Sequence, residues 1–208
     1  MGYTTDFIGH IDITPALNQD ETEYLTAFSA SRRFDRPGGP YAVPGNPYAE
    51  ERPGDDVQRY NRVAPGQPQL YCQWEPCWDG CCLSFDGHEK FYEPVRWLRY
   101  LVDHFLKPGA KASESGLPEF EHFTFDHEVR GMVVGCRRDT KELFAIKAHG
   151  TRITTTVLRR GDVAYWDRPP LPYEEQLDRE AARSRRRRRS TTGADSGVID
   201  LAERRTTG

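Results

Sequence analysis

Polar side chains gather in the middle of the sequence, between segments that read as strands and turns. Paired carboxylates beside a lysine can perform acid–base chemistry in a hydrolase or transferase. Around an aromatic ring, the same residue types can form a ligand-recognition face, or they can simply satisfy turns and ion pairs near a hairpin. We assign no catalytic residue. The candidate ligand-binding residues are Gln67, Gln73, Trp74, Asp86, Glu89, Lys90 and Tyr92, with Asp6 and Asp79 as outlying members of the group.

Four of the five cysteines lie close together in the sequence and suggest a zinc site. Cys72, Cys77, Cys81 and Cys82 have the spacing C-x4-C-x3-C-C, whereas structural zinc prefers paired knuckles with about two to four residues between members. Adjacent residues of a strand point to opposite faces, so Cys81 and Cys82 are not expected to share a site. A three-cysteine site completed by His88 is the alternative. We predict that Cys72 and one of the pair Cys81 and Cys82 are small core residues and that the others line a turn, with no metal and no cofactor.

Two further groups contain residues of catalytic type. Cys72 or Cys82 could act as a nucleophile with His104 or His88 as base, but no local signature supports a pairing. An acidic and histidine-rich run could bind metal or perform acid–base work, although polar residues on the open face of an antiparallel sheet look the same, and we favour that interpretation. The run comprises Glu119, Glu121, His122, Asp126, His127 and Glu128.

Positive charge is concentrated near the C-terminal end of the sequence. Seven arginines fall among the eleven residues from Arg179 to Arg189, against one acid, Glu180. Such runs bind phosphate backbones through charge, without sequence specificity. A solubilising disordered tail is the alternative, and a protein partner is also considered. The candidate nucleic-acid-binding residues are Arg183, Arg185, Arg186, Arg187, Arg188 and Arg189.

A predicted hairpin and helix position the central polar residues. In the strand 70–75, Leu70, Cys72 and Trp74 alternate with polar residues, Asp79-Gly80 forms a turn, and 81–85 returns as the partner strand. An amphipathic helix follows from Pro94 to Leu106, with an apolar stripe at three- and four-residue steps. We expect Cys72 and Trp74 to face the core together with Leu98 of this helix.

The remaining elements complete an α+β pattern. A strand over 3–13 precedes a helix over 19–34, which Asn18 and Glu21 begin with a capping box. A Pro/Gly-rich loop over 36–68 holds seven of the fifteen prolines and is either a surface crossing or a binding loop. Further strands are predicted over 119–126, 131–137, 142–148, 151–158 and 163–166.

Length and composition favour one domain with a tail. The 208 residues carry a net charge of −3, 37% are hydrophobic, and mean hydropathy is −0.77. We predict a single α+β domain over 1–167, then a proline-rich linker, an arginine-rich segment and a disordered tail over 168–208. We see no signal peptide and no apolar run that could span a membrane, and the odd cysteine count suggests reduced thiols, so we expect a cytoplasmic protein.

Several short motifs resemble those of a set of small uncharacterised bacterial proteins, mainly actinobacterial, and their phage and plasmid counterparts. The motifs are Gly2-Tyr3-Thr4-Thr5-Asp6-Phe7, Tyr24-Leu25, Arg32-Arg33, Pro65-Gly66-Gln67-Pro68, Cys72-Gln73-Trp74, Asp86-Gly87, Glu89-Lys90-Phe91-Tyr92 and Trp97-Leu98-Arg99-Tyr100-Leu101. The resemblance covers roughly residues 2–134 and implies no activity. Cys77, Cys81, Cys82 and His88 depart from the pattern, which has no cysteine at the first three positions and usually glycine at the fourth.

The sequence therefore predicts an α+β fold, with an antiparallel sheet of about five to seven strands and two helices on one face. The leading functional expectation is a cytoplasmic, non-catalytic binding or adaptor protein, with weak affinity for nucleic acid or another polyanion in its tail. The alternatives are a small hydrolase or transferase that uses Gln73, Asp86, Glu89 and Lys90, and a zinc-stabilised interaction module.

Overall fold

The computed structural model describes residues 4–45 and 57–162, together with residues 176, 179, 180 and 183. The chain divides into two compact units, Met1–Tyr165 and Trp166–Gly208. In the second unit the described residues show a hydrogen bond between the side chains of Gln176 and Glu180.

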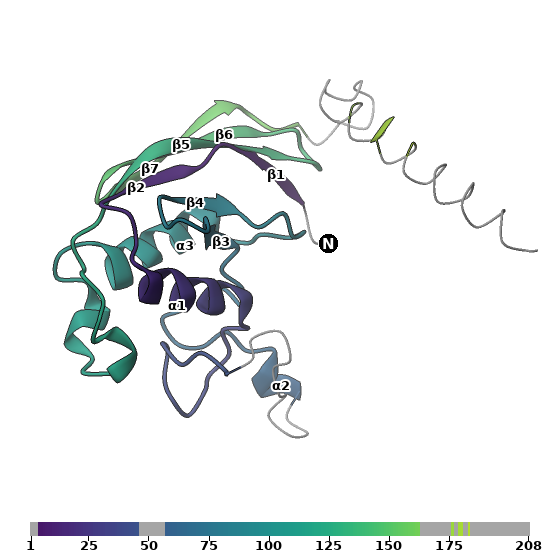
Figure 1. The fold of residues 1–208 in the computed structure, drawn as a ribbon. Helices are drawn as coiled ribbons and strands as arrows, with labels where there is room; N and C mark the ends of the chain where they lie inside the picture. The colour runs from purple at the N-terminus through teal and green to yellow at the C-terminus, as the bar shows by residue number, and fades with distance from the viewer. Residues whose placement is uncertain (1–3, 46–56, 163–175, 177–178, 181–182, 184–208) are drawn as a thin grey trace, which may run out of the picture. The chain divides into compact units, whose positions relative to one another are not determined.

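Seven antiparallel strands form one sheet, which is the main layer of an α+β fold (Figure 1). Along the sheet the order is β3-β4-β2-β5-β6-β7, and β1 also pairs with β5. The strands are β1 (Thr5–Ile8), β2 (Ile11–Thr14), β3 (Trp74–Pro76), β4 (Cys82–Phe85), β5 (Glu128–Arg137), β6 (Leu143–Gly150) and β7 (Arg152–Arg159).

The single N-terminal strand that the sequence predicts is divided in two at Gly9. Strand β1 pairs with the C-terminal half of β5, where Thr5 lies opposite Arg137, and β2 pairs with its N-terminal half. Gly9 has φ +103°, and a Cβ atom there would lie 2.5 Å from the carbonyl oxygen of Met132. Only glycine tolerates both this backbone conformation and this contact, so Gly9 permits the bend between the two strands.

Two helices lie on the same side of the sheet (Figure 1). Helix α1 (Gln19–Ala30) begins with the predicted capping box, in which the Asn18 side chain accepts from Glu21 N and the Glu21 side chain accepts from Asn18 N. It ends four residues earlier than predicted, at Ala30. Helix α3 (Pro94–Leu101) continues as a π-helical turn, η2 (Val102–Leu106), so the predicted 94–106 helix is confirmed with a change of winding near its end.

The core lies between these helices and the sheet. Cys72, Trp74 and Leu98 are all fully buried, as predicted from their shared strand face and the apolar stripe. The Trp74 indole N–H donates to the Pro94 carbonyl at 2.8 Å, which ties the hairpin to the start of α3. Phe7 contacts Trp74 and Phe91 edge-on, so β1 also joins this aromatic cluster.

Two local predictions are wrong. The segment 119–126 is not a strand; it contains the 3₁₀ turn Pro118–Phe120, and its aromatic residues pack around Tyr24 of α1. In the predicted strand 70–75, pairing begins only at Trp74, and the Leu70 carbonyl instead accepts from the backbone N–H of Arg33, just after α1. The predicted loop over 36–68 contains the short helix α2 (Val57–Tyr60). The predicted strand over 163–166 lies outside the described residues.

Candidate ligand-binding pocket

A cavity of about 490 Å³ lies where the end of α1, the segment before β3 and the loop after β4 meet. This size falls within the usual range for small-molecule sites. The residues around it are Ser29, Ala30, Gln69, Leu70, Tyr71, Gln73, Glu75, Asp86, His88, Glu89, Lys90 and Tyr92. Five of the seven predicted ligand-binding residues are in this set: Gln73, Asp86, Glu89, Lys90 and Tyr92.

The loop over 86–93 forms one wall of the cavity, and Gln73 holds it in place. The Gln73 side-chain amide donates to the His88 carbonyl at 3.0 Å and to the Glu89 carbonyl at 3.4 Å. It also lies 3.5 Å from the Asp86 carboxylate. Gln73 is itself buried, so its role here is to position the loop rather than to present a free amide to a ligand.

The same loop has an unusual backbone. Lys90 (φ 65°) and Glu93 (φ 56°) both adopt the left-handed conformation that side chains other than glycine seldom occupy. Between them, Phe91 is buried and stacks against Phe85. Phe91 anchors the loop to the core, and this arrangement leaves the neighbouring side chains of Lys90 and Tyr92 at the cavity. Strained loop conformations of this kind are often found at functional sites.

Carboxyl groups dominate the charge around the cavity. The lining contains three acidic residues, Glu75, Asp86 and Glu89, and one lysine, Lys90. Asp86 also contacts His88, whose Nδ1 lies 3.1 Å from the carboxylate. Burial raises the pKa of Glu75, and the neighbouring Asp86 charge raises it further. A cation in the cavity would relieve this repulsion.

Two other features of the cavity favour the binding of a positively charged ligand. Ser29 and Ala30 are the last residues of the twelve-residue helix α1, and the C-terminal end of a helix carries partial negative charge. Tyr71 and Tyr92 add aromatic rings to the wall, and cations are attracted to aromatic faces. Arg32 already uses the Tyr71 ring in this way, with its guanidinium 5.2 Å from the ring centre.

Gln67 and Trp74 lie away from the cavity. The Gln67 amide donates to the Pro40 carbonyl at 2.8 Å and contacts the Tyr100 hydroxyl at 2.9 Å, so Gln67 joins the proline-rich segment to α3. Trp74 is fully buried, with its indole N–H satisfied by Pro94. Both residues have structural contacts elsewhere, whereas the other five predicted residues line the cavity.

The sequence prediction missed seven residues around the cavity: Ser29, Ala30, Gln69, Leu70, Tyr71, Glu75 and His88. A signal for two of them was present, because Tyr71, Gln73 and Glu75 share the polar face of the segment whose other face is Cys72 and Trp74. His88 was considered only as a metal ligand or a base. The contribution of α1 had no signal in the sequence, because it arises from the way the helix packs against β3.

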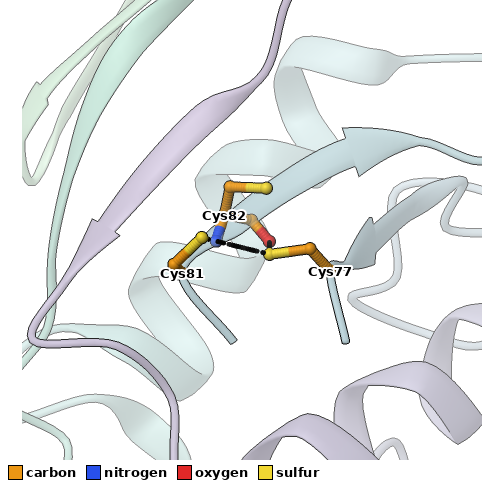
Figure 2. A group of neighbouring side chains, drawn as sticks. All are labelled: Cys77, Cys81 and Cys82. Carbon is orange, nitrogen blue, oxygen red and sulfur yellow. Dashed lines mark hydrogen bonds between the residues drawn. The ribbon is translucent and has the colours of Figure 1, made fainter. Parts of the chain in front are cut away.

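The cysteines follow the sequence expectation only in part. Cys72 is buried in the core, where burial raises the pKa of its thiol to about 12 and makes it a poor nucleophile. The sulfur atoms of Cys77, Cys81 and Cys82 lie within 4.8 Å of one another at the turn between β3 and β4 (Figure 2). The expectation that Cys81 and Cys82 cannot share a site is therefore wrong. Cys81 precedes the paired residues of β4, so strand alternation does not separate the two side chains.

The acidic and histidine-rich run is not an open sheet face. His127 is buried, with Nδ1 2.8 Å from the Pro15 carbonyl and Nε2 3.1 Å from the Glu21 carboxylate. Burial by itself would lower the pKa of His127, but its hydrogen bonds to Glu21 and Pro15 leave it raised. Both nitrogens face acceptors, so we assign His127 as an imidazolium in a structural ion pair with Glu21.

Of the predicted nucleic-acid-binding residues, Arg183 is described and exposed. Arg185, Arg186, Arg187, Arg188 and Arg189 lie outside the described residues, so this interpretation stays a prediction. Within the described part of the chain, no helix is both long and apolar enough to cross a membrane.

No protein-family model, curated protein or solved structure matches this chain. The resemblance to the small bacterial and phage proteins therefore stays a prediction, and the geometry of the pocket is the main indication of function.

Proposed function

We propose that this chain is a non-catalytic binding protein whose pocket takes a small organic cation, such as an amine or a guanidinium group. The observation that carries the proposal is the convergence of Glu75, Asp86 and Glu89 on a cavity that also receives the C-terminal end of α1. Carboxylates supply charge-assisted hydrogen bonds to such a group, and Tyr71 and Tyr92 supply aromatic surface.

Non-catalytic binding is favoured over hydrolysis because no serine or cysteine nucleophile is available among the residues described around the cavity. The Ser29 hydroxyl donates to the Trp74 carbonyl at 2.7 Å, and the cysteines are not part of the lining. Gln73, which the hydrolase alternative requires, is occupied by backbone carbonyls.

One observation does favour the enzymatic alternative. Asp86 and His88 form a carboxylate–imidazole pair beside Glu75, a carboxyl group with a raised pKa. Such groups can serve as a general base and a general acid. Hydrolysis of model esters or phosphates that is lost in His88→Gln, yet retained in Gln69→Ala, would support this function instead of simple binding.

The proposal is tested by calorimetric titration of the full chain with small amines and guanidines, together with neutral and anionic compounds of similar size. We expect the cations alone to bind. Glu75→Gln and Asp86→Asn should each weaken binding by about 10- to 100-fold, the range for a lost hydrogen bond to a charged group. Glu128→Gln, an exposed carboxylate on β5, is the matched control and should bind like the parent protein. Preferential binding of anions, or equal affinity in all four proteins, would overturn the proposal.

Protonation gives an independent readout of the same site. Glu75 has a raised pKa, so its carboxyl group becomes neutral at a higher pH than an ordinary glutamate. Cation affinity should therefore fall as pH falls toward the raised pKa, and this dependence should weaken in Glu75→Gln.

A further inference from the structure

Three thiols meet at the turn between β3 and β4, away from the pocket lining. The sulfur atoms of Cys77, Cys81 and Cys82 all lie within 4.8 Å of one another, and those of Cys77 and Cys81 are 3.6 Å apart (Figure 2). Thiolates on a tetrahedral zinc ion, each about 2.3 Å from the metal, are separated by about 3.7 Å. The three sulfurs are therefore already gathered at nearly the spacing that zinc requires.

The backbone holds these three residues together before any ligand binds. Cys77 N donates to the Cys82 carbonyl at 2.9 Å, and Gly80 N donates to the Cys77 carbonyl at 2.9 Å. Gly80 has φ +70°, and a Cβ atom there would lie 2.5 Å from the Leu17 carbonyl oxygen. These hydrogen bonds and the contact with Leu17 fix the backbone of the turn. Only the thiol side chains would therefore have to move when a metal binds.

Hydrogen bonding and accessibility also suit a metal site. The backbone N–H of Cys82 donates to the Cys77 sulfur at 2.9 Å, a contact that stabilises a thiolate. The exposed Asp79 carboxylate lies beside the Cys77 and Cys81 thiols and adds negative charge. Cys81 is exposed and the other two cysteines are half-buried, so an ion can reach the cluster from solvent.

We propose that Cys77, Cys81 and Cys82 bind one Zn²⁺ ion as three thiolates, with the fourth position open to solvent. Binding releases the thiol protons to solvent, and no oxidant or reductant is required. The expectation of no metal assumed that two of these cysteines diverge, and that assumption is incorrect. The site shares no residue with the cation pocket, so failure of one proposal leaves the other intact.

The test uses the full chain without any affinity tag, kept reduced until thiol titration shows all five cysteines free. Zn²⁺ should bind with one-to-one stoichiometry, and Co²⁺ should give the thiolate charge-transfer absorption of a tetrahedral site. Zn²⁺ should also raise the melting temperature, because it binds the folded state selectively. Cys81→Ser should weaken Zn²⁺ binding by at least about a hundredfold, the upper end of losses seen when only supporting residues of a metal site are removed.

Cys136→Ser is the matched control, because Cys136 lies on β5 outside the cluster; it should bind Zn²⁺ like the parent. Cys77→Ser and Cys82→Ser provide second and third variants, and each is compared by its metal-free melting temperature to confirm folding. The proposal is overturned if the reduced protein binds no Zn²⁺. It is equally overturned if the folded Cys81→Ser protein retains parental affinity.

Discussion

The buried amide of Gln73 lies 3.0 Å from the backbone carbonyl oxygen of His88, fifteen residues further along the chain. This contact helps to join the segment before β3 to the loop after β4, both of which line the pocket. A buried glutamine next to the aromatic residue Trp74 is unusual for packing alone. The N–H groups of its side-chain amide donate to the backbone carbonyls of a loop that has no regular backbone pairing of its own.

Replacing Gln73 by alanine should release this loop. The His88 carbonyl would lose its donor, which costs about 1 kcal/mol of the free energy of unfolding, and cation affinity should fall because Asp86 and Glu89 are no longer held together. Gln69→Ala is the matched control, since Gln69 lines the same pocket. Urea unfolding and calorimetric titration measure the two effects. Equal unfolding free energies and equal cation affinities in the two variants would show that Gln73 does not position the loop.

Trp74→Ala should destabilise the protein by about 3–5 kcal/mol, as expected for a large buried aromatic residue. The change removes the ring contacts with Phe7 and Phe91 as well as the hydrogen bond to Pro94. Trp78 is the natural comparison because it is 91% exposed, so Trp78→Ala should leave the unfolding curve unchanged. An unshifted curve for Trp74→Ala would contradict its assignment to the core.

The Glu21–His127 pair should make stability depend on pH in both directions. Burial acts to raise the pKa of Glu21, but hydrogen bonds from His127, Thr124 and Asn18 leave it lowered, so its contribution is present above about pH 4.5 and lost in more acidic solution. The raised pKa of His127 has the opposite effect: its contribution is present below about pH 6.5 and lost as pH rises through the raised value.

Urea unfolding across this range measures the prediction. Glu21→Gln should cost about 3–5 kcal/mol near pH 6, because it leaves a buried imidazolium without its partner. In His127→Asn the loss of stability on the alkaline side should disappear. His10→Asn provides the comparison, since His10 is exposed and its contact with Asp12 lies at the surface. A parental pH profile in His127→Asn would show that the pair does not titrate as proposed.

Deleting residues 173–208 should abolish any affinity for nucleic acid and leave the melting temperature nearly unchanged. The reason is that the arginine run concentrates one sign of charge, whereas the basic residues of the first unit are dispersed and interleaved with acids; Arg138, for example, pairs with Asp6. Titrations of duplex and single-stranded DNA with both forms, at low and physiological salt, measure this. Retained affinity with an unchanged salt slope in the truncated protein would place the binding surface on the first unit.

The sequence predicted the parts of this fold that depend on periodic patterns. The apolar stripe of α3 and the capping box of α1 mark their elements directly, and the strand alternation around Cys72 and Trp74 identified two fully buried residues. It failed at 119–126, where a segment rich in phenylalanine suggested a strand. Those rings instead pack on Tyr24 in an irregular segment, a tertiary contact that local propensity does not encode.

Prediction of the site was limited for a related physical reason. Gln73, Asp86 and Lys90 stood out because polar residues beside a hairpin are conspicuous, and they do line one cavity. Ser29 also lines the cavity, because α1 packs against β3. Residue spacing in the sequence does not predict this packing. The thiol cluster shows the limit of spacing rules, because Cys81 lies in the turn, where strand alternation does not apply.

The long-range pairing of β1 with β5 also constrains how the chain can be made. Asp6 and Arg138 are separated by 132 residues in the sequence, yet their side chains form a bidentate ion pair, in which Nε and Nη2 of Arg138 donate to the two carboxylate oxygens of Asp6. During synthesis β1 must wait, unpaired, until β5 has emerged, whereas β2 can pair earlier with β4 along one of its edges. Folding of the first unit should therefore be slow, as is usual for structures in which many contacting residues are far apart in the sequence. Until that step the edges of β1 and β2 are open to mispairing with other nascent chains, so growth conditions that slow translation should influence how much protein is recovered in soluble form.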